Sequence, residues 1–251
     1  MIPGQAVVFN EHKIYIPKYN LKSGGWNKVS LHFQNTYVTN SSGFHRYVDP
    51  VDGEVYVYTH LEPFNCNRWF PCFDQPSIRA LMQMRVILAD SKWVAISNEK
   101  LIKSESLQKD TIIEKEGLED SLTRLGFTKL GQRFDGTHHT FDKTPPISTY
   151  IYALAVGPYC SIPNESGYRV PMKIYCRKTK VPLAEAKERF RTIEIAIDFF
   201  EDYFQCKFPF NKYDMVFVPE FRINGMENVG IVIMRDTFMR PAEEKTFFEY
   251  Q

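Results

Sequence analysis

The sequence has no long hydrophobic run and no strong excess of either charge. No stretch reaches the roughly 18 apolar residues that a transmembrane helix needs, and residues 1–20 have neither the basic start nor the apolar core of a signal peptide. The 31 Lys and Arg balance the 30 Asp and Glu, which argues against the clustered positive charge of a nucleic-acid or anionic-membrane surface. We therefore predict a cytoplasmic protein that binds neither nucleic acids nor membranes.

Metal-ligand motifs are also scarce. The five cysteines are odd in number, widely spaced and without a CxxC motif, so we expect a reducing compartment and neither a disulfide framework nor a cysteine zinc site. None of the six histidines belongs to an HExxH or HxH motif, and the adjacent His138 and His139 would point to opposite faces of a strand. GxSxG, P-loop and GxGxxG motifs are absent as well. We predict no metal site in this chain, while a Ser/His/Asp arrangement stays open.

What the sequence does contain is a high proportion of β-forming residues. Hydrophobic residues make up 43% and aromatic residues 15% of the 251 residues, which is enough for a sizeable core. Segments rich in Val, Ile, Tyr, Phe and Thr predict strands at 13–19, 29–38, 54–62, 81–89, 92–98 and 137–159. Asp52-Gly53 predicts a β-hairpin. Residues 101–136 are charged and less periodic; they hold either a short helix around Leu118–Leu125 or a surface excursion between strands.

The character of the chain changes after residues 161–167, "SIPNESG", which we interpret as a linker. A strand is expected at 168–178, and a helix from Pro182, a residue suited to a first helical position. Apolar side chains recur along this helix at three- and four-residue steps and form one face: Leu183, Ala186, Phe190, Ile193, Ile197, Phe200 and Phe204. The order of elements predicts a β domain at 1–162 followed by part of an α+β domain at 163–251.

Two stretches are unusual. In "PEFRINGMENVG", residues 219–230, Glu227 and Asn228 stand between two apolar β-forming segments at 215–218 and 230–234. Glu227 is either a turn residue that points to water or a carboxylate held at a sheet edge to receive a cation. In "NRWFPCFDQP", residues 67–76, we expect a packed aromatic plug that ends in an Asp-capped turn.

Taken in order, several stretches resemble the M1 family of zinc aminopeptidases, the aminopeptidase N-like enzymes. They are "GFHRYVDPVDGEVYVYTHLEP", "FPCFDQP", "WVAISN", "TPPISTYIYALAVGPY", "FPFNKYDMVFVPEF" and "GMENVGIVIMRD". The resemblance runs from about residue 8 to the C-terminus and is weakest across 101–136. It implies a saddle-like β-sandwich domain, truncated at its N-terminus, followed by the first strand–helix–strand part of a thermolysin-like catalytic domain.

The resemblance also implies roles for individual residues. "NGMEN" matches the G-x-M-E-N exopeptidase motif of the family, in which the Glu, here Glu227, binds the free α-amino group of a peptide. Glu62, in "THLEP", matches a second acidic residue for the same amine. Backbone groups around three residues of the motif would line the peptide beside the scissile bond: Asn224, Gly225 and Met226. Asn228 completes the motif and His60 belongs to the first side-chain pocket.

The sequence departs from the family pattern at several positions. Asn224 replaces a Gly, His60 replaces a Gln that often precedes the Glu by two residues, and Asn65-Cys66-Asn67-Arg68 replaces "DARR". The HExxH motif that supplies zinc ligands and the general base is absent. Zinc is therefore expected for the complete family enzyme and not for this chain.

Three hypotheses follow for function. The first is the amine-recognising portion of an aminopeptidase, inactive by itself, whose partner is the N-terminus of a peptide. The second is a catalytically dead binding or scaffold protein derived from the family. The third is one half of a split enzyme, completed by a chain that carries HExxH and covers an apolar surface near Phe247 and Phe248.

Overall fold

A computed structural model describes residues 8–10, 13–31, 33–88, 90–107 and 136–240, in two units that divide between residues 32 and 33. The first unit contains β1 (Val8–Asn10), which pairs antiparallel with β2 (Lys13–Tyr15), and a short 3-10 helix, η1 (Lys18–Asn20). The second unit contains everything that follows. Within the described ranges, no helix has the length and apolar character needed to cross a bilayer.

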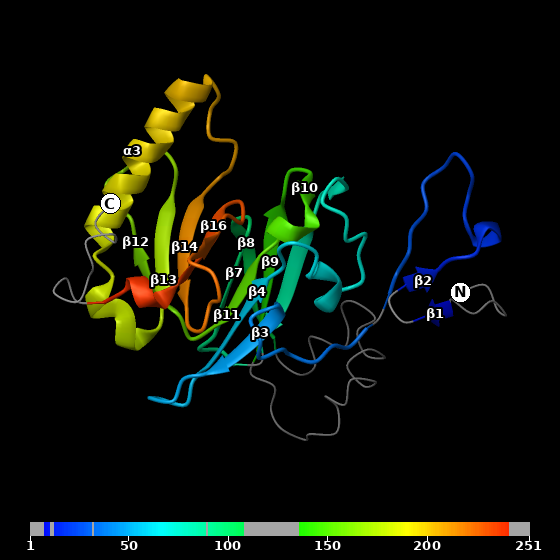
Figure 1. The fold of residues 1–251 in the computed structure, drawn as a ribbon, viewed down its shortest axis with the longest axis horizontal. Helices are drawn as coiled ribbons and strands as arrows, with labels where there is room; N and C mark the ends of the chain where they lie inside the picture. The colour runs from blue at the N-terminus through cyan, green and yellow to red at the C-terminus, as the bar shows by residue number, and fades with distance from the viewer. Residues whose placement is uncertain (1–7, 11–12, 32, 89, 108–135, 241–251) are drawn as a thin grey trace. The chain divides into compact units, whose positions relative to one another are not determined.

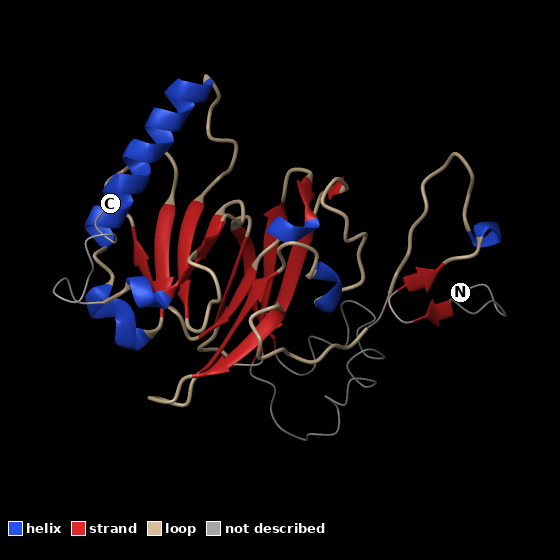
Figure 2. Cartoon of the chain, in the orientation of Figure 1, coloured by secondary structure: helices blue, strands red, loops and turns tan. Residues whose placement is uncertain are grey.

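Two antiparallel sheets form the first part of the second unit (Figures 1 and 2). One has the strand order β3 (Gly43–Val48), β4 (Val55–His60), β11 (Leu154–Gly157) and β7 (Val94–Ser97). The other has the order β6 (Gln83–Leu88), β9 (Gly136–Lys143) and β8 (Leu101–Leu107). Two short strands, β5 (Arg79–Ala80) and β10 (Ile147–Ser148), pair with each other beside the 3-10 helices η2 (Cys66–Arg68) and η4 (Thr149–Ile151).

The sheet that contains β4 is covered on both faces. On one face, Val57, Leu154 and Val156 pack with Leu88 and Phe141 of the β6–β9 sheet, which makes a sandwich. Residues on its other face pack against a third sheet in a separate apolar cluster. This double burial explains why the first four positions of β4, Val55 to Tyr58, are all apolar or aromatic instead of alternating with polar residues.

The third sheet has the strand order β12 (Cys160–Pro163), β13 (Met172–Cys176), β14 (Tyr213–Val218), β16 (Ile231–Arg235) and β15 (Gly225–Met226). Strands β13, β14 and β16 are parallel, and β15 is an antiparallel edge strand. The helix α3 (Ala186–Phe204) lies along one face of this sheet, where Phe190 and Ile197 pack on Met215 and Phe217 (Figure 1). Two 3-10 helices, η5 (Lys178–Leu183) and η6 (Asp236–Phe238), complete the layer.

A buried ion cluster joins the third sheet to the β3–β4 hairpin. Arg177, just after β13, forms ion pairs with Asp49 in the hairpin turn and with Asp236 at the start of η6. Both carboxylates are almost fully buried. Burial by itself lowers the pKa of Arg177, but Asp236 and Asp49 hold it above its ordinary value, so the cluster is charged at neutral pH. Removing one member would leave an uncompensated buried charge.

The predicted fold class is confirmed: the chain is mainly β, with a β-sandwich followed by a strand–helix–strand segment. The predicted hairpin at Asp52-Gly53 is also present, with Val48 paired to Val55. Several local predictions were wrong. Pro182 lies in η5 and α3 begins four residues later, because Glu185 has a left-handed backbone that separates the two helices.

The other differences concern strands. Residues 161–163 of the expected linker belong to β12, which pairs with β13 over Cys160 to Pro163. Residues 29–38 form no described strand apart from one bridge between Val38 and His45. β8 forms within the charged segment at 101–107, and the helix considered around residues 118–125 lies outside the described residues. The domain boundary at residues 162 and 163 stays a prediction.

Candidate functional site

The segment 219–230 connects the parallel strands β14 and β16, and its first turn is held by the β3–β4 sheet. The Tyr58 hydroxyl donates a hydrogen bond to the Pro219 carbonyl oxygen (2.6 Å), and the Ser41 hydroxyl donates to the Glu220 carbonyl oxygen (2.5 Å). Ser41 and Glu220 both have positive φ angles, 54° and 52°, which non-glycine residues adopt only where the surrounding structure enforces them. The β3–β4 sheet therefore fixes how the segment leaves β14.

A buried histidine completes this contact. The Ser41 N–H donates to Nδ1 of His45 (3.0 Å), so Nε2 carries the proton and faces the Glu220 carboxylate at 3.5 Å. His45 is fully buried. Burial lowers the pKa of His45, and the neighbouring Glu220 only partly opposes the shift. The histidine is therefore neutral at pH 7 and acts as an acceptor for the Ser41 backbone.

The middle of the segment is held by one arginine of β16. Arg235 donates from Nε to the Phe221 carbonyl oxygen (2.8 Å) and from Nη2 to the Arg222 carbonyl oxygen (2.6 Å). Its backbone N–H donates to the Asn224 carbonyl oxygen (3.0 Å). One residue thus satisfies three carbonyl groups of an irregular segment, which would otherwise depend on water.

The end of the segment is held by buried polar side chains. Asn98, directly after β7, donates to the Val229 carbonyl oxygen (2.8 Å) and to that of Ile151 (3.0 Å). The buried Lys212 ammonium donates to the Gly230 carbonyl oxygen (2.7 Å) and pairs with Asp214. Gly230 has a φ of +72°, and a Cβ atom there would lie 2.1 Å from the Asn98 carbonyl oxygen. No other residue type fits this close approach.

Glu227 is exposed at the centre of this fixed segment, directly after the edge strand β15. Met226 is buried beneath it in the cluster between the two sheets, whereas Asn224 and Gly225 are exposed. Gly225 and Met226 pair on one side with β16, and β15 is the last strand of its sheet. A solvated turn residue and a cation-binding carboxylate would both be exposed at this position, so both interpretations agree with the exposure of Glu227.

Asn228 connects the 219–230 segment to the backbone at Tyr152. It is buried, and its Nδ2 donates to the Tyr152 carbonyl oxygen (3.2 Å). Its Oδ1 has no hydrogen-bond partner among the described residues. A buried acceptor of this kind has a free energy cost unless a ligand or water satisfies it. Asn228 therefore offers an unsatisfied acceptor one residue after Glu227.

The second predicted acidic residue lies at the end of β4. Glu62 is exposed, and the preceding Leu61 is fully buried in a cluster that also contains Val229. The structure therefore brings the supports of Glu62 and Glu227 together, although the two positions are 165 residues apart in the chain (227 − 62). His60 is buried, with its ring 5.0 Å from that of Phe221 in the 219–230 segment. Nδ1 of His60 donates to the Ser41 carbonyl oxygen (2.7 Å), and Nε2 has no hydrogen-bond partner among the described residues.

Sequence reasoning missed most of the residues that position this site. Asn98, Arg235, Tyr58 and Ser41 act from other elements, and none of them stands out by type or spacing. Asn98 had the best available signal, since it is a polar residue directly after a buried apolar strand.

Sequence reasoning also missed a group formed by Cys66, Cys72 and Asp74, whose sulfur and oxygen atoms lie within 4.8 Å of one another. The expected aromatic plug is only partly present: Trp69 and Phe70 pack in a buried cluster, but Phe73 is 80% exposed. The Asp74 carboxylate accepts from the Asn67 and Thr149 side chains.

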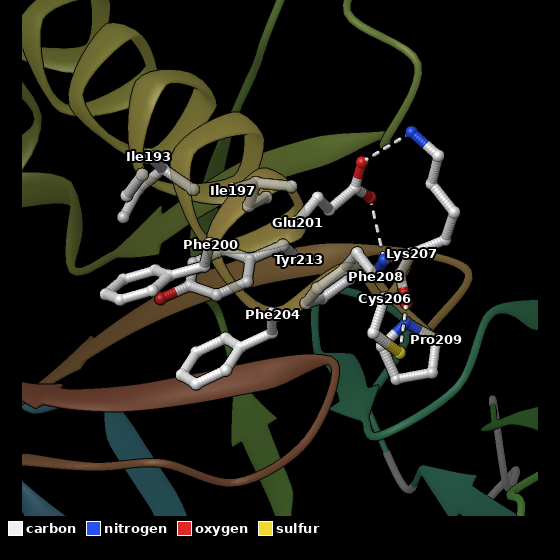
Figure 3. Close-up of a pocket in the computed structure, with 11 residues that line it drawn as sticks. Ile193, Ile197, Phe200, Glu201, Phe204, Cys206, Lys207, Phe208, Pro209 and Tyr213 are labelled. Carbon is white, nitrogen blue, oxygen red and sulfur yellow. Dashed lines mark hydrogen bonds and ion pairs between the residues drawn. The ribbon is translucent and has the colours of Figure 1, made fainter.

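A separate apolar groove of about 480 Å³ runs along the C-terminal half of α3 (Figure 3). Ile193, Ile197, Phe200 and Phe204 line one side of it. At its rim the Glu201 carboxylate accepts from Lys207 Nζ (2.9 Å) and the Phe208 N–H (2.7 Å), and these bonds, the backbone one first, lower the pKa of Glu201. The groove contains none of the residues that the sequence placed in the site.

Comparison with known proteins supports the family resemblance. Residues 6–115 match the Peptidase M1 N-terminal domain, and residues 189–247 match the Peptidase family M1 domain. The chain is 33% identical to aminopeptidase N of Streptomyces lividans over 237 residues. This aligned region covers 93% of this chain and 24% of that protein. It is 29% identical over 218 residues to aminopeptidase 2 of Candida albicans, an alignment that covers 86% of this chain and 20% of that protein. It is 28% identical over 212 residues to glutamyl aminopeptidase of Rattus norvegicus, with 84% of this chain and 20% of that protein covered.

The chain thus spans about a quarter of the length of the relatives that it matches, and both domain matches fall in the order expected from the sequence. The two matches include Glu62 in the first and Glu227 in the second. These similarities, together with the sandwich and the strand–helix–strand segment, show that the chain belongs to the M1 family of peptidases.

Proposed function

We propose that this chain carries the part of an M1 aminopeptidase that recognises the free amino group at the N-terminus of a peptide. Glu227 and Glu62 bind the ammonium group, and the exposed edge of β15 around Asn224, Gly225 and Met226 lines the peptide backbone. The buried Asn228 supports Glu227 through its hydrogen bond to the Tyr152 carbonyl oxygen, and His60 shapes the pocket for the first side chain.

One observation carries the proposal: the backbone of the 219–230 segment is fixed by side chains from three other elements, and Glu227 is nonetheless exposed. A turn residue with no role requires no such support, whereas a charged group that must receive a ligand at a set position does. A peptide without a free N-terminus brings no positive charge to Glu227, so the arrangement favours exopeptidase over endopeptidase substrates.

Hydrolysis itself is not assigned to this chain. M1 enzymes in general depend on zinc, which supplies a Lewis acid and an activated water. The sequence has no HExxH motif, and the described residues contain one group of three potential ligands, Cys66, Cys72 and Asp74. Two thiols and one carboxylate do not match the family's two histidines and one glutamate, so this group does not fit the catalytic zinc. We infer that the chain by itself is inactive.

Binding of short peptides to the folded chain tests the proposal. A tripeptide with a free N-terminus should bind more tightly than its N-acetylated form, and E227Q should abolish most of that difference. We expect a loss of roughly tenfold, about 1.4 kcal/mol, since Glu227 is solvent-exposed. E62Q should have a smaller effect in the same direction.

E165Q is the matched control, because Glu165 is equally exposed on the 164–167 turn and loses the same charge. Isothermal titration calorimetry or chemical-shift perturbation would measure the affinities. Equal affinity for free and acetylated peptides in the wild type would refute amine recognition.

A binding role that depends on a partner is the second candidate. The observation that favours it is the apolar groove along α3, where Phe200 and Phe204 are 51% and 65% exposed. The occupant would be a polypeptide that carries the HExxH segment, since the matched relatives are about four times as long as this chain. Aminopeptidase activity that arises only on mixing with such a polypeptide would distinguish a split enzyme from a scaffold protein.

A further inference from the structure

The fold brings two cysteines together that the sequence separates by five residues. Cys66 begins η2 and Cys72 lies on the return of the same loop, and their sulfur atoms are within 4.8 Å of each other. All five cysteines of the chain are free thiols in the structure. A close pair of thiols in a short loop can form an internal disulfide, which a single exposed thiol such as Cys206 cannot do by itself.

The loop is closed independently of the sulfur atoms. Both the backbone N–H and the side-chain Nδ2 of Asn67 donate to Asp74 Oδ2, at 3.0 and 2.7 Å. The Cys66 carbonyl oxygen accepts from the backbone N–H groups of Trp69 and Phe70. Asp74 is held in turn by the Thr149 hydroxyl (2.8 Å). These bonds hold the two ends of the loop close together. A disulfide between the thiols would therefore cost little additional loop-closure entropy.

The two thiols differ in access and acidity. Cys66 is fully buried, whereas Cys72 is partly exposed. A hydrogen bond between them raises the pKa of Cys66, as does burial, and the same bond lowers the pKa of Cys72 against the opposing effects of burial and Asp74. Cys72 is therefore the thiol that reacts first, and Cys66 is placed to react with it next.

We propose that Cys66 and Cys72 are an oxidation site that forms an intramolecular disulfide by exchange with a low-molecular-weight disulfide, RSSR. The Cys72 thiolate attacks one sulfur of RSSR, forms Cys72–S–SR and releases RS⁻. Cys66 then loses its proton to solvent, attacks the Cys72 sulfur and expels the second RS⁻. The two cysteines are oxidised by two electrons, and RSSR is reduced to two RSH.

The Cys160 and Cys176 pair serves as an internal comparison. These residues are direct partners in the register of β12 and β13, yet Cys176 is fully buried and its pKa is raised by burial to about 12. The fully buried Cys176 thiol is neither accessible nor acidic in the way that the partly exposed Cys72 thiol is. We expect no bridge there under conditions that oxidise the loop.

Tryptic mapping of the folded wild-type chain tests the proposal. The reduced protein is treated with oxidised glutathione and then denatured, free thiols are blocked with iodoacetamide, and peptides are identified by mass spectrometry. Trypsin cleaves after Arg68, so Cys66 and Cys72 fall in different peptides and a bridge appears as a cross-linked pair. We expect that pair, with Cys160, Cys176 and Cys206 alkylated. In the reduced protein, Cys72 should be alkylated roughly tenfold faster than Cys66.

C66S should stop the reaction at a glutathione adduct on Cys72, and C160S, the control, should leave the bridge intact. A stable glutathione adduct on Cys72 of the wild type, no reaction of Cys72, or a bridge between Cys160 and Cys176 in its place would each overturn the proposal. The wild-type map decides the question even if C66S fails to fold. The readouts are peptide masses, so the outcome is independent of the proposed peptide binding.

Discussion

The segment 219–230 and the helix α3 both contact the third sheet. The irregular segment is the more extensively bonded to other elements, and the regular helix is the more exposed at its end. The segment is mostly irregular, yet its carbonyl groups are paired with Tyr58, Arg235, Asn98 and other side chains. The helix is regular for 19 residues, yet its last two turns expose several aromatic side chains: Phe199, Phe200, Tyr203 and Phe204. Distant residues thus satisfy the backbone of the irregular segment, whereas a regular helix satisfies its own backbone and can leave its side chains exposed.

The largest expected effect comes from filling the space at Gly230. G230A should lower the free energy of unfolding by roughly 3–5 kcal/mol, because the new Cβ would lie 2.1 Å from the Asn98 carbonyl oxygen at a φ of +72°. Urea denaturation followed by tryptophan fluorescence would measure it. G167A is the control: Gly167 has a φ of +77° but nothing within 4 Å of its Cβ position, so only the backbone strain of about 1–2 kcal/mol is expected. Equal losses for the two variants would show that the close approach has no role.

The next effect concerns Asn98, which joins three segments. N98A should lower the free energy of unfolding by about 2–3 kcal/mol, because the buried groups of Ile151, Ala153 and Val229 lose their partner. N67A is the control, since Asn67 also makes several hydrogen bonds but is exposed, and water can replace them at a cost of under about 1 kcal/mol. If N98A also weakens binding of a free-amine peptide beyond its effect on stability, Asn98 positions Glu227.

A smaller effect should follow from acid. The pKa of His45 in the folded protein is lowered below its ordinary value of 6.5 by burial, so the unfolded chain binds a proton first as pH falls. The stabilisation is complete above pH 6.5 and is lost as pH falls from 6.5 toward the folded pKa. Urea midpoints at pH 7.5 and 5.5 should differ less in H45Q than in the wild type, with H138Q as control. An unchanged difference in H45Q would assign the pH dependence to other groups, such as His139, whose pKa burial also lowers.

The smallest effect is expected at the exposed end of α3. F204S should change the free energy of unfolding by no more than about 0.5 kcal/mol, because Phe204 is already 65% exposed. If the wild-type chain self-associates through the groove along α3, light scattering should show less association for F204S, since the substitution removes apolar surface. F190S, from the buried end of the same helix, should cost roughly 3–5 kcal/mol. A large loss of stability in F204S would mean that the aromatic pairs on α3 stabilise the helix itself.

Local signals predicted the parts of the fold that depend on neighbours in sequence. Asp52-Gly53 specified the hairpin because turn geometry is set by a few adjacent residues. The apolar segments around Glu227 became β14 and β16, and the apolar periodicity of 183–204 became α3. The helix start was wrong because the αL backbone at Glu185 has no clear sequence signal, and β15, with two residues, is too short to be recognised by alternation.

The site could be predicted only in outline. Motif resemblance pointed to Glu227 and Glu62, and the structure adds that Leu61 and Val229 share one buried cluster. The hydrogen bonds that fix the segment join residues up to 179 positions apart, as between Ser41 and Glu220. Pairings over such distances follow from how whole sheets pack, which single-sequence patterns do not contain.

The sequence by itself determined the fold class and the family resemblance, and that resemblance pointed to Glu62 and Glu227, because composition, periodicity and motif order can be read without the tertiary structure. Only the tertiary structure decided that Arg235 and Asn98 fix the Glu227 segment, that β15 is an edge strand, and that Cys66 lies against Cys72. The physical reason is that buried polar groups must find partners wherever packing places them, and packing depends on the whole chain at once.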